Sequence, residues 1–264
     1  MCRKRTETGV GQLAGIDWAA LLPFIAVGFA AQLIDGAMGM AFGLINSTLL
    51  VSMLGVSPAV ASASVHAIEA FTTAASGISH AAHRNVDWRL LPRIAVPGVI
   101  GGVLGAYVLS SVDASVAKPF VMAYLAAIGL YLLLRAWRGA VEPRSPRIIE
   151  PLGLAGGFLD AAGGGGWGPI VASNLLIQGA EPRRTIGTVN TAEFFITSTV
   201  SATFFMTLGW GAFTIAMVGL LIGGLLAAPF GGVLAKHVPA RPLMAGVGVL
   251  LTATSIYTIW QSVR

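Results

Sequence analysis

Long apolar stretches, joined by short polar connections, make up most of this chain from about Trp18 onward. The same pattern occurs twice: an apolar hairpin interrupted by glycines is followed by three longer apolar segments. Each longer segment has about the 20 residues that a helix needs to cross a bilayer. The pattern predicts an all-α polytopic membrane protein with about eight transmembrane segments. The predicted elements are a hairpin over 18–54 with segments over 59–82, 90–110 and 116–135, and a hairpin over 148–179 with segments over 185–208, 212–234 and 239–260.

The composition agrees with a membrane protein. Of the 264 residues, 55% are hydrophobic and 10% are charged, and the mean hydropathy is +0.80. Soluble domains average about 25% charged residues. The apolar stretches leave no part of the chain free for a soluble domain. The net charge of +5 comes from basic residues spread over the connections, which indicates oriented membrane helices and no nucleic-acid partner.

The two halves are related in sequence. Residues 27–45 align with 152–170, residues 64–71 with 188–195, and residues 99–106 with 221–228. Paired acids and glycine spacing in one order are hard to obtain by chance, so we predict an internal two-fold repeat. The predicted parts are an N-terminal tail at 1–17, a first repeat at 18–138, a basic linker at 139–147 and a second repeat at 148–264. The polar pairs that the repeat aligns are Asp35 with Asp160, His66 with Asn190, Glu69 with Glu193, and Lys118-Pro119 with Arg241-Pro242.

Basic residues in the connections leave two topologies open. If each hairpin returns to its side of entry and each half then crosses three times, the halves are inverted copies and every basic cluster faces the cytoplasm. The basic N-terminal tail then lies outside. If each hairpin counts as one crossing, the halves are parallel and the clusters of the second half lie outside. We favour the inverted plan. The clusters are Arg84/Arg89/Arg93, Arg135/Arg138/Arg144/Arg147, Arg183/Arg184 and Lys236/Arg241.

Four acids lie inside apolar stretches, whereas the other seven lie in the tail or in polar connections. A charge within a membrane costs several kcal/mol unless it faces a cavity or a partner. These four are therefore candidate substrate-binding or ion-binding residues. They are Asp35, Glu69, Asp160 and Glu193.

Each candidate acid also has a structural interpretation. Asp35 and Asp160 precede glycine-rich breaks, where a carboxylate either caps the restarting helix or holds a proton or cation. Glu69 follows His66 by about one helical turn, and Glu193 follows Asn190 likewise, so each polar pair shares a helix face. Such a pair either joins helices or serves transport. His66 has no second histidine at ligand spacing, so no metal site is predicted.

Glycine-rich motifs interrupt both hairpins: LIDGAMGMAFG at 33–43 and FLDAAGGGGWGP at 158–169. Four consecutive glycines disfavour a helix, because each costs about 1 kcal/mol relative to alanine. The motifs predict broken or re-entrant helices at Asp35–Gly43 and Asp160–Gly168. Free N–H groups there could bind an anion; the alternative is close helix packing through small residues. The candidate residues of the breaks are Gly39, Gly43, Gly164, Gly165 and Gly168, with Trp167 and Phe42 at equivalent places as gating or packing residues.

With these motifs the chain resembles the TauE/SafE family, the sulfite-exporter-like membrane permeases. The resemblance rests on LIDGAMGMAFG with NSTLLVSMLGVSPAVASASV (46–65), and on FLDAAGGGGWGP with EPRRTIGTVNTAEFF (181–195), and it extends over about 24–260. It implies about eight transmembrane helices from an internal duplication. It also implies movement of small sulfur oxyanions or organosulfonates across a bacterial inner membrane, often outward.

The residues and the resemblance together predict a multi-pass secondary transporter of the cell inner membrane. Its expected cargo is a small anion, sulfite or an organosulfonate, and an ion or proton gradient is expected to drive it. Because ionised acids would repel an anion, some of the four must be protonated or paired when cargo binds. The alternatives are a cation transporter or channel with carboxylate ligands, and an intramembrane enzyme or scaffold. No catalytic residue and no cofactor are predicted, and homo-oligomerisation is left open.

Overall fold

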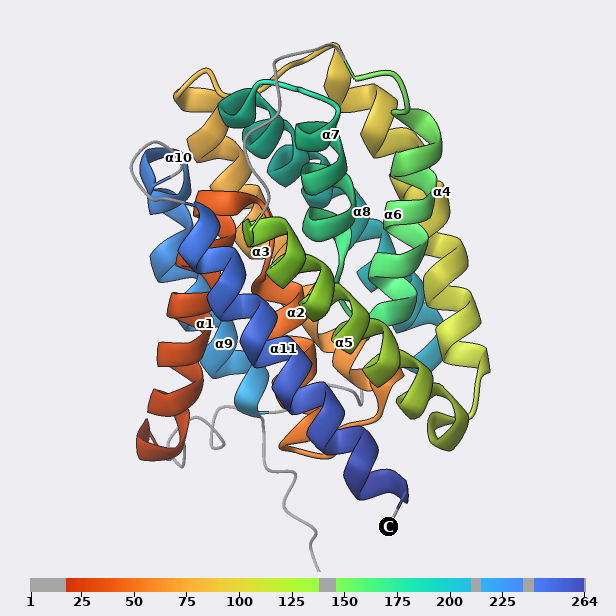
Figure 1. Cartoon of the computed structure of the whole chain (residues 1–264). Coiled ribbons are helices and arrows are strands. Elements are labelled where there is room, and N and C mark those ends of the chain that lie inside the picture. Colours follow the sequence, from red (N-terminus) through yellow and green to blue (C-terminus); the bar gives the residue numbers. More distant parts are fainter. Residues whose placement is uncertain (1–17, 138–145, 210–214, 235–239, 264) are drawn as a thin grey trace, which may run out of the picture.

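The computed structural model describes residues 18–137, 146–209, 215–234 and 240–263, and within these ranges the chain is helical with no strand (Figure 1). The predicted tail at 1–17 and most of the predicted linker at 139–147 lie outside the described residues. The helices are α1 (Trp18–Met38), α2 (Phe42–Ser52), α3 (Pro58–Ala82), α4 (Leu90–Ser111), α5 (Ala114–Trp137), α6 (Glu150–Gly163), the short π-helical turn η2 (Gly168–Ala172), α7 (Ser173–Ile177), α8 (Pro182–Leu208), α9 (Ile215–Ala227), the 3₁₀ turn η4 (Ala228–Phe230), α10 (Gly231–Leu234) and α11 (Ala240–Val263).

Both predicted hairpins turn back inside the bundle and return to the end at which they start. In the first hairpin, Pro23 of α1 and Leu54, beyond the end of α2, line the same apolar cleft. In the second, Gln178 follows α7 and its side-chain oxygen accepts hydrogen bonds from the N–H groups of Arg147 and Ile148, just before α6, at 2.8 and 3.0 Å. Figure 1 shows the first hairpin opening at the lower end of the bundle and the second at the upper end.

The two central helices, α3 and α8, run antiparallel against each other. At the upper end, a guanidinium nitrogen of Arg183 donates to the carbonyl oxygen of His83 at 2.8 Å. Farther down, the rings of His66 and Phe204 lie 6.3 Å apart. An early position on each helix thus meets a late position on the other.

The halves interlock instead of forming separate bundles. Helix α4 packs on α6 of the second hairpin, and α9 packs on α1 of the first. Helix α5 packs on α11 across the front of the bundle (Figure 1). Each hairpin therefore packs on a helix from the other half of the chain.

Glycines let these helix pairs approach until their backbones touch. A Cβ atom added to Gly101 of α4 would run into the backbone carbonyl of Leu154 on α6. An added Cβ on Gly223 of α9 would likewise meet the carbonyl of Ile25 on α1. Close packing through small residues is the usual way in which membrane helices associate without a hydrophobic driving force.

Helices α4 and α5 are long and apolar enough, by length and composition, to cross a membrane. The central α3 and α8 do not meet that criterion, because they contain many hydroxyl and charged side chains; the surrounding helices bury most of these. Large apolar side chains instead face outward, where lipid would meet them. Among the most exposed are Trp137, Met206 and Phe120, at 89%, 88% and 71%. Shorter apolar stretches are Leu21–Ala37, Phe42–Ser52, Ala216–Phe230 and Ala245–Trp260.

We expect Gly101→Ala to destabilise the bundle by about 1 to 3 kcal/mol, the usual cost of overpacking, because its methyl group would push α4 away from α6. Gly246→Ala on α11 is the matched control, because an added Cβ there has no heavy atom within 4 Å. The midpoint of thermal unfolding in detergent should fall for the first variant and stay level or rise for the second. Equal midpoints would show that the two backbones are not in tight contact.

Candidate functional site

The helix breaks are shorter than the sequence predicts. Helix α1 continues through Asp35 to Met38, and α6 continues through Asp160 to Gly163, so each acid lies in the last turns before a break. The interruptions themselves cover residues 39–41 and 164–167. Both begin with a glycine in the left-handed region: φ is +67° at Gly39 and +73° at Gly164.

The two breaks meet each other near the middle of the bundle. An added Cβ on Gly165 would lie 2.7 Å from the backbone nitrogen of Leu44, and one on Gly168 would run into Met40. The hydroxyl group of Ser47 on α2 donates a hydrogen bond to the carbonyl oxygen of Gly164. Residues about 120 positions apart therefore form one continuous structure.

All four predicted acids surround these breaks and are buried. Their exposed fractions are 3% for Asp35, 2% for Glu69, 2% for Asp160 and 5% for Glu193. They come from α1, α3, α6 and α8, and they lie close enough for their charges to interact with one another. Within the described residues, no group of three His, Cys, Asp or Glu side chains is arranged to hold a metal ion.

Three of the four acids face the N–H groups of the helices that restart after the breaks. The N–H of Trp167, at the start of η2, donates to Oδ1 of Asp160 at 2.9 Å. The Asp35 carboxyl group faces the N–H of Phe42 at the start of α2, and the Glu69 carboxyl group faces the N–H of Gly43. These N–H groups form the positive ends of the half-helices. The positions that the sequence predicts for an anion are thus occupied by the protein's own carboxyl groups.

His66 joins the second break to α3. Its Nε2 lies 3.1 Å from Oδ2 of Asp160, and its Nδ1 lies 2.7 Å from the carbonyl oxygen of Ser62. The hydroxyl group of Ser62 donates to the carbonyl oxygen of Ala161 at 2.7 Å. The ion-pair partner of His66 is therefore an acid from the other half of the chain, and not Glu69 on its own helix.

Asn190, which aligns with His66, lies beside the first break but forms a different hydrogen bond. Its side-chain nitrogen donates to the carbonyl oxygen of Ile186 at 3.3 Å, and an added Cβ on Gly39 would lie 3.4 Å from that nitrogen. Within the part of the chain that the structure describes, one carboxylate oxygen of Glu69 and one of Glu193 have no hydrogen-bond partner. Both oxygens are available to a proton, a cation or a polar cargo.

The predicted gating residues are fully enclosed. Trp167 is 0% exposed, and its ring nitrogen donates to the carbonyl oxygen of Val189 on α8 at 3.1 Å. Its ring fills the space between Gly98 on α4 and Gly156 on α6. Phe42 takes the corresponding place in the first half, packed near Gly224 of α9. Trp167 thus closes the gap between three helices above the second break.

Sequence reasoning missed three residues at the site. Ser62 lies one turn before His66, so helical spacing could have found it. Ser47 is the middle residue of a polar run, Asn46 to Thr48, inside the apolar hairpin, and this run could have drawn attention to it. Tyr124 of α5 lies against the second break, where an added Cβ on Gly163 would collide with its ring. No local signal predicts that contact.

The chain is similar to known membrane proteins. The family described as Sulfite exporter TauE/SafE matches residues 24–258. The chain belongs to the TauE/SafE family. A probable membrane transporter protein, YtnM of Bacillus subtilis, is 40% identical over 252 residues, which cover 91% of this chain and 84% of that protein. A probable membrane transporter protein of Haemophilus influenzae is 28% identical over 254 residues, covering 92% and 96%. No solved structure matches the chain.

Family and relatives establish that the protein is a membrane transporter, and they point away from an enzyme. The resemblance seen in the sequence motifs is therefore confirmed. The predicted site residues and the predicted domain bounds go beyond what the comparisons address.

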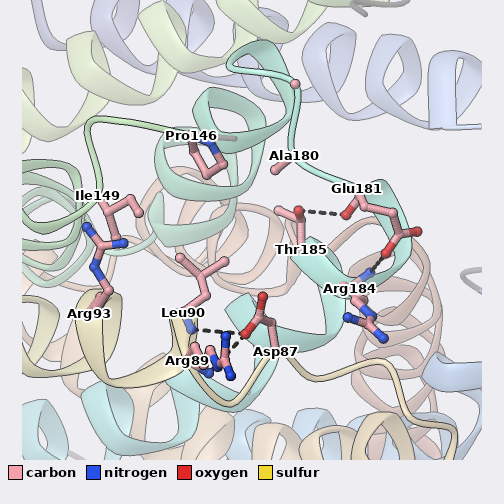
Figure 2. A pocket seen from close by; sticks show the side chains of 11 residues that line it. Asp87, Arg89, Leu90, Arg93, Pro146, Ile149, Ala180, Glu181, Arg184 and Thr185 are labelled. Atoms are coloured by element: carbon pink, nitrogen blue, oxygen red, sulfur yellow. Dashed lines mark hydrogen bonds between the residues drawn. The ribbon is translucent and has the colours of Figure 1, made fainter. Parts of the chain in front are cut away.

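At the upper end of this TauE/SafE bundle, a cavity of about 560 Å³ opens between the ends of the second hairpin, α4 and α8 (Figure 2). The ends of α4, α6 and α8 meet there, and the charged groups of the cavity are Asp87, Arg89, Arg93, Glu181 and Arg184. None of the cavities that we describe is lined by the four buried acids. We call the upper cavity the basic mouth.

Carboxylates in the basic mouth are engaged with helix ends, as Figure 2 shows. Asp87 accepts from the N–H groups of Arg89 and Leu90, at 2.9 and 3.2 Å, and so caps α4. Glu181 caps α8 in the same way. Arg89 and Arg184 form no ion pair with a described residue. Their guanidinium groups can therefore interact with anions that approach from solution.

We expect Trp167→Phe to lower the stability of the protein by about 1 to 3 kcal/mol, because it removes a buried hydrogen-bond donor and part of a buried ring. The control is Trp88→Phe, because Trp88 is 66% exposed and surface substitutions change stability by about 0.5 kcal/mol or less. Unfolding midpoints of both variants in detergent provide the measurement. If the two midpoints shift equally, the ring of Trp167 does not fill the space between α4, α6 and α8 tightly.

Proposed function

We propose that this transporter moves a small anion, sulfite or an organosulfonate, across the cell inner membrane, driven by a proton or ion gradient. The observation that supports it most is the pair of helix breaks whose N–H groups face carboxyl oxygens of the protein itself. The family's description as sulfite exporters supports a sulfur oxyanion as cargo. A sulfonate or sulfite oxygen makes the same kind of hydrogen bond as a carboxylate oxygen.

The proposed topology is an inverted two-fold repeat, 18–138 and 148–264, with six crossings and two re-entrant hairpins. Three observations support it: the hairpins open at opposite ends, α3 and α8 run antiparallel, and each hairpin packs on a helix of the other half. The end with the basic mouth would face the cytoplasm, because positive residues concentrate on that side. Transporters built from inverted repeats bind cargo near the midplane, at the interface of the repeats and at broken helices.

The described conformation would then be a closed state. Trp167 separates the basic mouth from the acids, since its ring touches α4 two turns below Leu90 and α6 two turns below Ile149. A cargo anion would first meet Arg89 and Arg184 and would pass Trp167 only when the second hairpin moves. Once inside, it would compete with the Asp35 and Asp160 carboxyl groups for the helix ends.

A cation transporter that uses the four carboxylates as ligands is the alternative. It is supported by the unpartnered oxygens of Glu69 and Glu193. It is weakened by the lack of a metal-binding group among the described residues. The helix ends also favour anions over cations at the breaks.

Uptake into proteoliposomes tests the proposed function. We expect labelled sulfite or a sulfonate to accumulate severalfold when a pH gradient is imposed, because acids that repel the anion must gain protons before it binds. Empty liposomes are the control. Accumulation that is equal with and without the pH gradient would remove proton coupling. A protein that moves divalent or alkali cations and no sulfur anion would favour the cation alternative.

The basic mouth provides a second prediction. Arg89→Gln with Arg184→Gln should raise the KM for sulfite uptake about three- to tenfold and leave the maximal rate nearly unchanged, because the arginines act before the central site. The effect should shrink at high salt, since about 0.1 M salt screens charges beyond about 10 Å. Lys118→Gln, at the other end of the bundle, is the control. An unchanged KM in the double variant would exclude the mouth from the cargo path.

A further inference from the structure

Only one of the two aligned aspartates has a histidine partner among the described residues; the buried His80 of α3 contacts the backbone of Gly36 near the first break. Asp160 has His66 as its partner. In the other repeat the residues that align with this pair are Asp35 and Asn190, and the side-chain amide of Asn190 donates to its own helix. The serine beside His66 also occurs in one repeat only, because the residue that aligns with Ser62 in the second repeat is Ile186. A His–Ser–Asp network therefore exists on α3 and α6 but not at the aligned positions of the other repeat.

Hydrogen-bond partners fix the proton on Nδ1 of His66. This nitrogen lies 2.7 Å from the carbonyl oxygen of Ser62 and 3.3 Å from the Ser62 hydroxyl oxygen. The hydroxyl proton is already donated to Ala161. Both neighbours of Nδ1 thus offer lone pairs only, so Nδ1 must be the donor.

A second proton must lie between His66 and Asp160. A neutral ring with its proton on Nδ1 would present a lone pair at Nε2, and an ionised carboxylate also presents a lone pair. At the observed 3.1 Å, these two lone pairs would repel each other. The contact therefore holds one proton, on Nε2 or on Oδ2, and the pair is neutral as a whole in either form.

The groups around this pair can only add negative charge. Asp35 on α1, Glu69 on α3, Tyr124 on α5 and Glu193 on α8 face it. None of these groups carries a positive charge in either of its protonation states. Loss of the shared proton would leave an Asp160 carboxylate among acids, with a neutral His66 beside it. Such a buried and unpaired charge is costly, so loss of the proton and opening of the pair must occur together.

We propose that the His66–Asp160 pair is the proton-binding site that couples transport to the proton gradient, and that the cargo anion replaces the Asp160 carboxylate between His66 and Trp167. This inference rests on the proposed function. The cargo would accept hydrogen bonds from Nε2–H of His66 and from the N–H of Trp167. Asp160 would take up a proton from water and withdraw as the neutral acid.

Charge and proton balance follow from these positions. Before binding, the pair holds the Nδ1 proton and one shared proton, and its charge is zero. Afterwards, His66 is an imidazolium with two ring protons and Asp160 holds a third. One proton is taken up with one monovalent anion, and the net charge of the site stays at zero. Asn190 cannot titrate, and His80 contacts the backbone of Gly36 instead of pairing with Asp35. The first break therefore contributes no such pair, and one coupled proton per cargo ion is expected.

Proton movement measured together with sulfonate movement tests the proposal. Methanesulfonate is the probe, because its own charge does not change near neutral pH, and a pH dye inside proteoliposomes reports protons while the membrane potential is clamped. The wild type should move one proton with each sulfonate. Asp160→Asn should lose the proton movement, because its amide still accepts from Trp167 and donates to His66 but holds no titratable proton. His83→Asn, outside the network, is the matched control and should keep the coupling.

Nitrogen-15 spectra of the four histidines in lipid provide a readout without transport. The His66 signal is identified by its loss in His66→Asn. Its Nδ1 should stay protonated at every pH. The Nε2 signal should change as the pH rises, because the proton shared with Asp160 is lost. This change should be absent in Asp160→Asn. Sulfonate uptake without protons in the wild type, or a His66 signal that Asp160→Asn leaves unchanged, would overturn the proposal. If no sulfonate moves at all, the proposed cargo falls, and the spectra still decide whether the pair binds a proton.

Discussion

The interaction on which this structure depends is that between buried carboxyl groups and the N–H groups of interrupted helices. A carboxylate taken out of water loses several kcal/mol of solvation unless charge-assisted hydrogen bonds replace it. An interrupted helix inside a bilayer has the opposite need, because its freed N–H groups cannot reach water. The hydrogen bond from the N–H of Trp167 to the Asp160 carboxyl group satisfies both groups at once. The same arrangement recurs where Asp35 faces Phe42.

Reciprocal packing explains why the site forms between the halves of the chain. Each hairpin lies on a helix of the other half, and the glycines of α4 and α9 bring the backbones into contact. The hairpins therefore reach the centre from opposite ends and touch there, at Gly165 and Leu44. A shift of one half against the other would change the distances between Asp160 on α6 and its partner on α3. The coupling between shape and charge is built into the way the helices interlock.

Much of this arrangement could be predicted from the sequence, for physical reasons. Apolar length predicts the segments, and left-handed glycine conformations can be expected where glycines cluster, as at Gly39 and Gly164. Acids in apolar stretches mark the site because their burial must be compensated. Contacts between distant segments could not be predicted in this way. His66 shares a helix face with Glu69 by spacing, yet it pairs with Asp160, 94 residues away, because helix packing decides which faces meet.

The difference between the halves has a consequence for the energetics of transport. If the two inverted halves were identical, the inward-open and outward-open states would differ only in which half adopts which conformation. The protein would then have the same free energy in both states. Ser62 and His66 hold the second hairpin, whereas Ile186 and Asn190 stand at the corresponding places beside the first. In the proposed transport cycle, the second hairpin would therefore open only when a network of hydrogen bonds breaks. Under the proposal above, the free-energy difference between the two states would depend on the protons held by this network, and a duplicated scaffold would acquire a direction from a feature that its halves do not share.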